Sequence, residues 1–124
     1  MLSALLIDDD MIEKMNLEKT LQKSMTQGFN LYHATSIEDG MKVLAENSID
    51  IVFLDDNLGI GPESKNNTIS LRSVSDKVPI IVISNFVDAD HLSSGAFITA
   101  YDIVDKSDLS DRIKSGLLNP FLPS

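Results

Sequence analysis

The sequence has no cysteine, only two histidines, few basic residues and no long apolar run. Without cysteine, neither a disulfide framework nor a thiolate metal site is available, and only His33 and His91 offer imidazole nitrogen. No apolar stretch approaches the length of a membrane span, and residues 1–7 lack the basic start of a signal peptide. We therefore expect an intracellular, cytoplasmic protein that uses oxygen ligands, with no functional role for either histidine.

Positive charge is also scarce. The 10 Lys and Arg residues face 19 Asp and Glu residues, which gives a formal charge of −9. Such a surface repels phosphate backbones and anionic lipid, so we expect this domain to bind neither nucleic acid nor membrane directly. A chain of 124 residues, 43% of them hydrophobic, is long enough for one globular core. We predict one domain over residues 1–118 and a tail or linker stub over 119–124.

Apolar runs typical of strands alternate with helical patterns along the chain. The first helix should carry Met15, Leu17, Leu21 and Met25 on one face and close at Gly28, and Ser36 should cap the second. Strands are predicted over 3–7, 29–35, 49–54, 79–83 and 100–104, and the later helices over 37–47, 64–75, 88–95 and from 109 to about 118. This alternation predicts an α/β domain with a parallel sheet and helices on both faces.

Reactive polar side chains follow these strands where each one ends. Because ligands bind outside the carboxyl ends of parallel strands, we expect these residues to converge. They are Asp8-Asp9, Asp55-Asp56-Asn57, Ser84-Asn85 and Lys106. Carboxylates about 4 Å apart repel by roughly 4 kcal/mol per pair at an effective dielectric constant of about 20, so such a cluster favours a bound divalent cation.

Each of these residues also has a purely structural interpretation. Asp8 to Asp10 can cap the first helix, and Asp10 is better explained as a cap than as a ligand. Residues 55–57 can form a polar turn, and Lys106 can be a solvated surface residue. The hydroxyl of Ser84 can simply bond to backbone. It is the joint order of these residues at successive strand ends that favours a site.

That order resembles the receiver domain of response regulators in two-component signalling, from Leu5 to about Leu118. The resemblance implies a single doubly wound (βα)5 domain with strand order 2-1-3-4-5. It also implies that Asp55 is the phosphoacceptor and that Asp8, Asp9, Asp55 and the backbone carbonyl of Asn57 bind Mg²⁺. By the same resemblance, Lys106 and Ser84 contact the phosphoryl group.

The function implied by this resemblance is that of a phosphoreceiver in a phosphorelay. The donor would be a sensor histidine kinase or a histidine phosphotransfer protein, and the output would pass to a downstream protein partner or an effector domain. The resemblance implies a signalling domain and no classical enzyme, with phosphotransfer and slow self-dephosphorylation as its only reactions.

Several positions depart from the usual receiver pattern. Ile103 stands where an aromatic switch residue is usual, with Tyr101 two positions away on the same predicted strand face. Ser107 replaces a proline, so Lys106 must be positioned by other means, and Asn85 replaces a small residue. These departures concern switching more than phosphate and metal chemistry.

Two other functions stay open at the level of sequence. A receiver-like interaction module that signals without phosphorylation would explain the altered switch positions. A small haloacid-dehalogenase-type phosphatase would explain Asp8-Asp9-Asp10 as an Asp-x-Asp motif, although its second acidic motif should follow Lys106 and the chain leaves no space for a cap.

Overall fold

The computed structural model describes residues 1–25, 28–55, 71, 73–75, 77–84 and 101–122. All five predicted strands are present, and their ends differ from the prediction by at most two residues. The elements in chain order are β1 (Leu2–Ile7), α1 (Met11–Ser24), β2 (Phe29–Ala34), α2 (Ile37–Glu46), β3 (Ile51–Asp55), β4 (Ile80–Ser84), β5 (Asp102–Asp105), α5 (Leu109–Lys114) and the 3₁₀ helix η1 (Asn119–Phe121).

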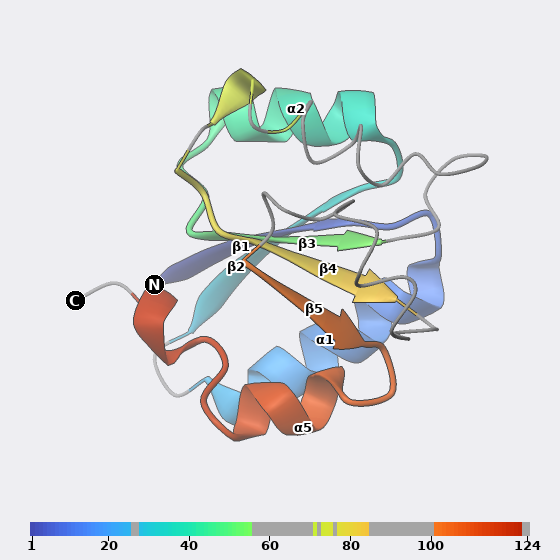
Figure 1. Cartoon of the computed structure of the whole chain (residues 1–124), viewed down its shortest axis with the longest axis vertical. Helices are drawn as coiled ribbons and strands as arrows, with labels where there is room; N and C mark the ends of the chain where they lie inside the picture. Colours follow the sequence, from blue (N-terminus) through green and yellow to red (C-terminus); the bar gives the residue numbers. More distant parts are fainter. Residues whose placement is uncertain (26–27, 56–70, 72, 76, 85–100, 123–124) are drawn as a thin grey trace.

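The strands form one sheet of order β2-β1-β3-β4-β5, and every pairing is parallel. The predicted order 2-1-3-4-5 is therefore confirmed. The arrowheads of β3, β4 and β5 point the same way, as parallel pairing requires (Figure 1). In the register, Asp55 pairs with Ile83 and Ser84 pairs with Asp105, so the carboxyl ends of these strands reach one edge of the sheet together.

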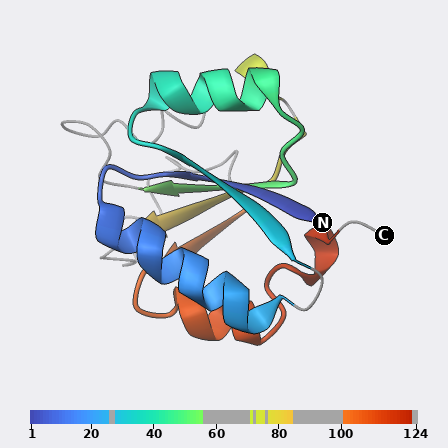
Figure 2. The same ribbon diagram turned by 180° about the vertical axis from the view of Figure 1, so that it is seen from behind.

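Helices cover both faces of the sheet. α1 and α5 lie side by side on one face, and α2 covers the other (Figures 1 and 2). The central strands therefore bury alternate residues on opposite sides, which explains why they are apolar without interruption. Phe53 packs in the core on the α1/α5 side, whereas Val52 and Leu54 pack on the α2 side.

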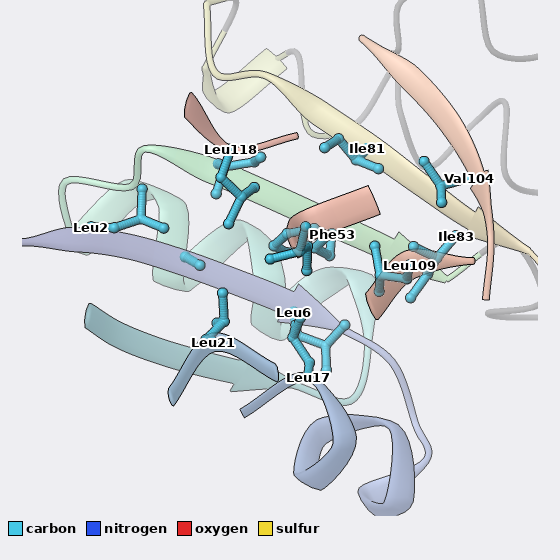
Figure 3. Packing of buried hydrophobic residues seen from close by; sticks show 13 residues of the cluster. Leu2, Leu6, Leu17, Leu21, Phe53, Ile81, Ile83, Val104, Leu109 and Leu118 are labelled. Carbon is cyan, nitrogen blue, oxygen red and sulfur yellow. The ribbon is translucent and has the colours of Figure 1, made fainter. Parts of the chain in front are cut away.

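The core on the α1/α5 side is built around Phe53, which is fully buried. Figure 3 shows its side chain among residues contributed by strands and by both helices. The labelled residues of this core are Leu2, Leu6, Leu17, Leu21, Phe53, Ile81, Ile83, Val104, Leu109 and Leu118. α1 packs on this core through Leu17 and Leu21, and it begins directly after the aspartates that follow β1.

The start of α1 follows the capping interpretation, but two details of the prediction need correction. Asp10 is the N-cap, and its Oδ1 accepts a hydrogen bond of 2.8 Å from the Ile12 amide. The buried face contains Leu17 and Leu21, whereas Met15 is 52% exposed, because it lies about 200° around the helix from Leu17. The helix also ends at Ser24 and is closed by Met25, well before Gly28.

The second helix begins at the predicted cap, since Ser36 Oγ accepts a hydrogen bond of 3.2 Å from the Asp39 amide. Most of the predicted helix 64–75, and all of the predicted helix 88–95, lie outside the described residues. Residues 71, 73 and 74 do have helical backbone. No helix in the described part of the chain is long and apolar enough to cross a membrane.

Candidate functional site

Five of the predicted site residues lie at the carboxyl edge of the sheet. Asp55 and Ser84 are the last residues of β3 and β4, Asp8 and Asp9 follow β1, and Lys106 follows β5. Asp8, Asp55 and Ser84 are buried, whereas Asp9 is exposed. The topology thus brings together residues that are almost 100 positions apart, as the sequence predicted.

Lys106 is the cation of this cluster. Its Nζ lies 3.3 Å from Asp55 Oδ1 and 3.5 Å from Asp8 Oδ2, and its side chain is only 12% exposed. Burial alone would lower the pKa of Lys106, but the charges of Asp55 and Asp8 outweigh it, so the pKa lies above its usual value. The ammonium group therefore stays charged. The interpretation of Lys106 as a solvated surface residue is wrong.

Asp8 is an unfavourably placed carboxylate in the chain by itself. Its pKa is raised to about 6, mainly by burial and further by the charge of Asp55, against the opposing effects of a hydrogen bond from the Asp10 amide and the charge of Lys106. Oδ1 accepts that bond from the Asp10 amide at 2.9 Å. Within the described residues, Oδ2 is buried and accepts no hydrogen bond. Its ion pair with Lys106 is long, at 3.5 Å, so an additional positive ligand would stabilise this oxygen further.

Asp8, Asp9 and Asp55 fit a divalent cation. Each offers one carboxylate oxygen, and these oxygens all lie within 4.8 Å of one another. A hard cation such as Mg²⁺ favours a few carboxylate oxygens together with water, and the exposed Asp9 leaves room for water. Asn57, whose backbone carbonyl was predicted as a further ligand, lies outside the described residues, as does Asn85.

The turn after β5 shows how Lys106 is held without a following proline. Its amide donates a hydrogen bond of 2.8 Å to the carbonyl oxygen of Ser84, which extends the ladder between β5 and β4. Ser107 then donates from its hydroxyl at 2.7 Å and from its amide at 2.9 Å to Asp105 Oδ1. These two bonds lower the pKa of Asp105. A turn closed by Asp105 and Ser107 thus positions Lys106 between them.

The region where receivers usually carry an aromatic switch residue is arranged differently here. Ile103 packs against the core on the α2 side. Tyr101 precedes β5, and its amide bonds to Ile80 at the start of β4, so it lies at the opposite end of the strand from Ser84. Its ring instead meets Phe121 edge-on, with 4.8 Å between ring centroids. Tyr101 does not stand in for an aromatic residue at position 103.

The structure adds one residue that the sequence interpretation had set aside. Nε2 of His33, on β2, lies 2.7 Å from the backbone carbonyl oxygen of Asp8. The relevant signal was topological, because β2 neighbours β1 in the sheet and His33 stands one position before the end of β2. His91 lies outside the described residues.

The Asp-x-Asp interpretation does not fit this geometry. Asp10, the second acid of that motif, caps α1 through its side chain and is exposed. The acidic group that shares Lys106 with Asp8 is Asp55, which precedes Lys106 in the chain. The arrangement therefore differs from the motif order expected of a dehalogenase-type phosphatase.

No family model and no curated protein matches this sequence, but many solved structures match the fold. Response regulator TrrA from Thermotoga maritima, in complex with Mg²⁺ and BeF, is 23% identical; the match covers 98% of this chain and 100% of that chain, with a TM-score of 0.79. The beryllofluoride-activated NtrC4 receiver domain is 20% identical over 98% of this chain and 97% of that chain, also with a TM-score of 0.79.

A third structure, the Mn²⁺-bound form of response regulator Rcp1, is 16% identical over the full length of both chains, with a TM-score of 0.75. At these identities the similarity concerns the fold. The chain has the fold of response-regulator receiver domains, which are signalling domains, and its acidic cluster occupies the carboxyl edge of the same type of sheet.

Proposed function

We propose that this chain is a phosphoreceiver that accepts a phosphoryl group on Asp55. The observation that carries the proposal is the contact of one largely shielded lysine, Lys106, with two carboxylates from different strand ends, next to a third carboxylate. Phosphoryl transfer depends mainly on positioning and on neutralising charge. Lys106 would supply part of this neutralisation, and a divalent cation held by the acidic cluster would supply the rest.

Each residue has a defined task in this proposal. An ionised Asp55 oxygen attacks phosphorus, the P–N bond of a phosphohistidine breaks, and its electron pair stays on the imidazole nitrogen. Lys106 lies 3.3 Å from Asp55 Oδ1, close enough to stabilise first the carboxylate and then a phosphoryl oxygen. Ser84, the last residue of β4, supplies a hydroxyl for another phosphoryl oxygen.

Asp8, Asp9, Asp55 and the carbonyl of Asn57 would hold Mg²⁺, which supplies charge neutralisation to the transferring group. The unsatisfied Oδ2 of Asp8 and the spacing of the three carboxylates support this ligand set. Asp9, exposed beside the two buried acids, would hold the metal on the side of the site that solvent reaches.

The donor in this proposal is a sensor histidine kinase or a histidine phosphotransfer protein in the cytoplasm. Phosphorylation would shift the chain between two conformational populations that a downstream protein or effector domain distinguishes. Slow self-dephosphorylation would reset it. With a formal charge of −9, any contact with DNA would have to come from another domain.

A second candidate, an interaction module that signals without phosphorylation, is favoured by one observation. Tyr101 packs on Phe121, and Ile103 replaces the usual aromatic residue, so neither of these two positions provides the common coupling of a hydroxyl and an aromatic ring. This argues for a different output, whereas the ion pairs of Lys106 with Asp55 and Asp8 argue for retained phosphate chemistry.

A single experiment distinguishes the two candidate functions. The purified chain is incubated with acetyl phosphate in Mg²⁺ or in EDTA, and its intact mass is measured. We expect a mass increase of one phosphoryl group in Mg²⁺ only, lost in Asp55→Asn and kept in Asp10→Asn, which removes the same charge from an exposed helix cap. No Mg²⁺-dependent increase in the wild type would leave the interaction module as the better explanation.

A further inference from the structure

We propose that His33 is a positioning residue for the predicted metal ligands Asp8 and Asp9. This inference rests on the proposed function, because it concerns the same Mg²⁺ site. His33 is half-buried on β2, and its Nε2 lies 2.7 Å from the backbone carbonyl oxygen of Asp8. A carbonyl oxygen only accepts hydrogen bonds, so Nε2 carries the hydrogen and donates it.

The bonded carbonyl belongs to the peptide unit that joins the two ligands. Its carbon comes from Asp8 and its nitrogen from Asp9, so the orientation of this plane constrains the backbone from which both carboxylates project. The preceding amide, that of Asp8, donates to the carbonyl oxygen of Ala34 at 3.0 Å. Two neighbouring residues of β2 therefore fix the backbone of Asp8 on both of its sides.

This constraint acts where the chain leaves the sheet. β1 ends at Ile7 and α1 begins at Met11, so only three residues make the turn, and two of them are predicted ligands. Beyond the Asp8 amide the backbone ladder to β2 stops, and the imidazole of His33 supplies the next bond from a side chain. Groups that hold the ligands of a metal in place typically change metal affinity by about 10- to 100-fold when they are removed.

The test compares Mg²⁺ binding, by titration calorimetry at about pH 8, in three variants. His33→Leu removes the donor and keeps the bulk. His33→Gln places an amide N–H at a similar distance from the backbone. Asn30→Ala changes an exposed residue near the other end of β2 and serves as the matched control. Urea unfolding of each variant in EDTA checks that the fold is retained.

We expect the Kd for Mg²⁺ to rise about 10-fold in His33→Leu, to return close to the wild-type value in His33→Gln, and to stay unchanged in Asn30→Ala. Equal affinity in wild type and a folded His33→Leu overturns the inference and leaves the proposed function standing. A wild type that binds no Mg²⁺ overturns the proposed function, and the inference with it.

A measurement on the wild type alone decides the matter if His33→Leu does not fold. Long-range ¹H–¹⁵N spectra of the imidazole ring at about pH 8 report which nitrogen carries hydrogen. We expect the Nε2–H tautomer, with the Nε2 resonance shifting when Mg²⁺ is added, since the bonded peptide joins the ligands. A Nδ1–H tautomer, or ring resonances unchanged by bound Mg²⁺, contradicts the inference.

Discussion

Replacing Asp8 with asparagine should stabilise the metal-free chain. Asp8 is fully buried, and its pKa is raised from 3.8 to about 6, first by burial and then by the charge of Asp55. At about 1.4 kcal/mol per pKa unit, a difference of about two units corresponds to roughly 3 kcal/mol. Asparagine has the same shape and carries no charge, so Asp8→Asn should recover much of this free energy at about pH 7.5.

The sign of the pH dependence follows from the raised pKa. Between about pH 4 and pH 6 the folded chain keeps a proton on Asp8 that the unfolded chain has released, so folding stability falls as pH rises through this window. Above the window Asp8 is ionised in both states and the loss is complete. The advantage of Asp8→Asn should therefore be full at about pH 7.5 and almost absent near pH 4.

Urea unfolding in EDTA at these two pH values measures the effect. Asp10→Asn is the matched control, because it also removes one negative charge, but from an exposed residue. Asparagine can cap the helix as aspartate does, so this change should alter the free energy of unfolding little. Adding Mg²⁺ should stabilise the wild type and leave Asp8→Asn almost unchanged. A destabilised Asp8→Asn at about pH 7.5, or an equal gain at both pH values, would refute the reasoning.

Three further changes test other contacts. Lys106→Met removes the cation shared by two carboxylates and should slow phosphorylation by acetyl phosphate about 100-fold, as followed by intact mass. Ser107→Ala deletes the hydroxyl bond of 2.7 Å to Asp105 and should raise the pKa of that carboxyl towards its ordinary value in an NMR titration. In Gly40→Ala, the new Cβ would stand 2.9 Å from Cγ1 of the buried Ile7. Alanine favours the helix more than glycine does, but this clash should outweigh that gain. Urea unfolding should therefore show a free energy of unfolding lower by about 1–2 kcal/mol.

Much of the fold could be predicted from the sequence because its signals are local. A strand buried on both faces must be apolar at every position, and Ile51 to Leu54 meet this requirement. The details that were predicted wrongly depend on contacts between secondary-structure elements. Residues such as Met15 look equally apolar in the sequence, and only the packing of α1 against the sheet shows which face is buried. Asp55 joins β3 because Ile83 on β4 pairs with it.

In the candidate site, too, some features could be predicted from local sequence signals and others depend on contacts between distant residues. Polar residues directly after apolar strands predicted that Asp8, Asp55 and Lys106 would meet, and the ion pairs in the structure agree. The contribution of His33 could not be read from its sequence neighbours, since its partner is a backbone carbonyl 25 positions away. Backbone carbonyls leave no trace in the residue types, so contacts of this kind become visible only once the strand order is known.

The central claim is that Asp55 carries the phosphoryl group, and mapping the modified residue tests it most directly. The chain is treated with acetyl phosphate and Mg²⁺, the acyl phosphate is reduced with borohydride, and the peptides are sequenced by mass spectrometry. We predict that reduction converts Asp55 alone to the alcohol, and only in samples that contained Mg²⁺. Reduction at Asp8 or Asp9, or no reduced aspartate at all, would contradict the account.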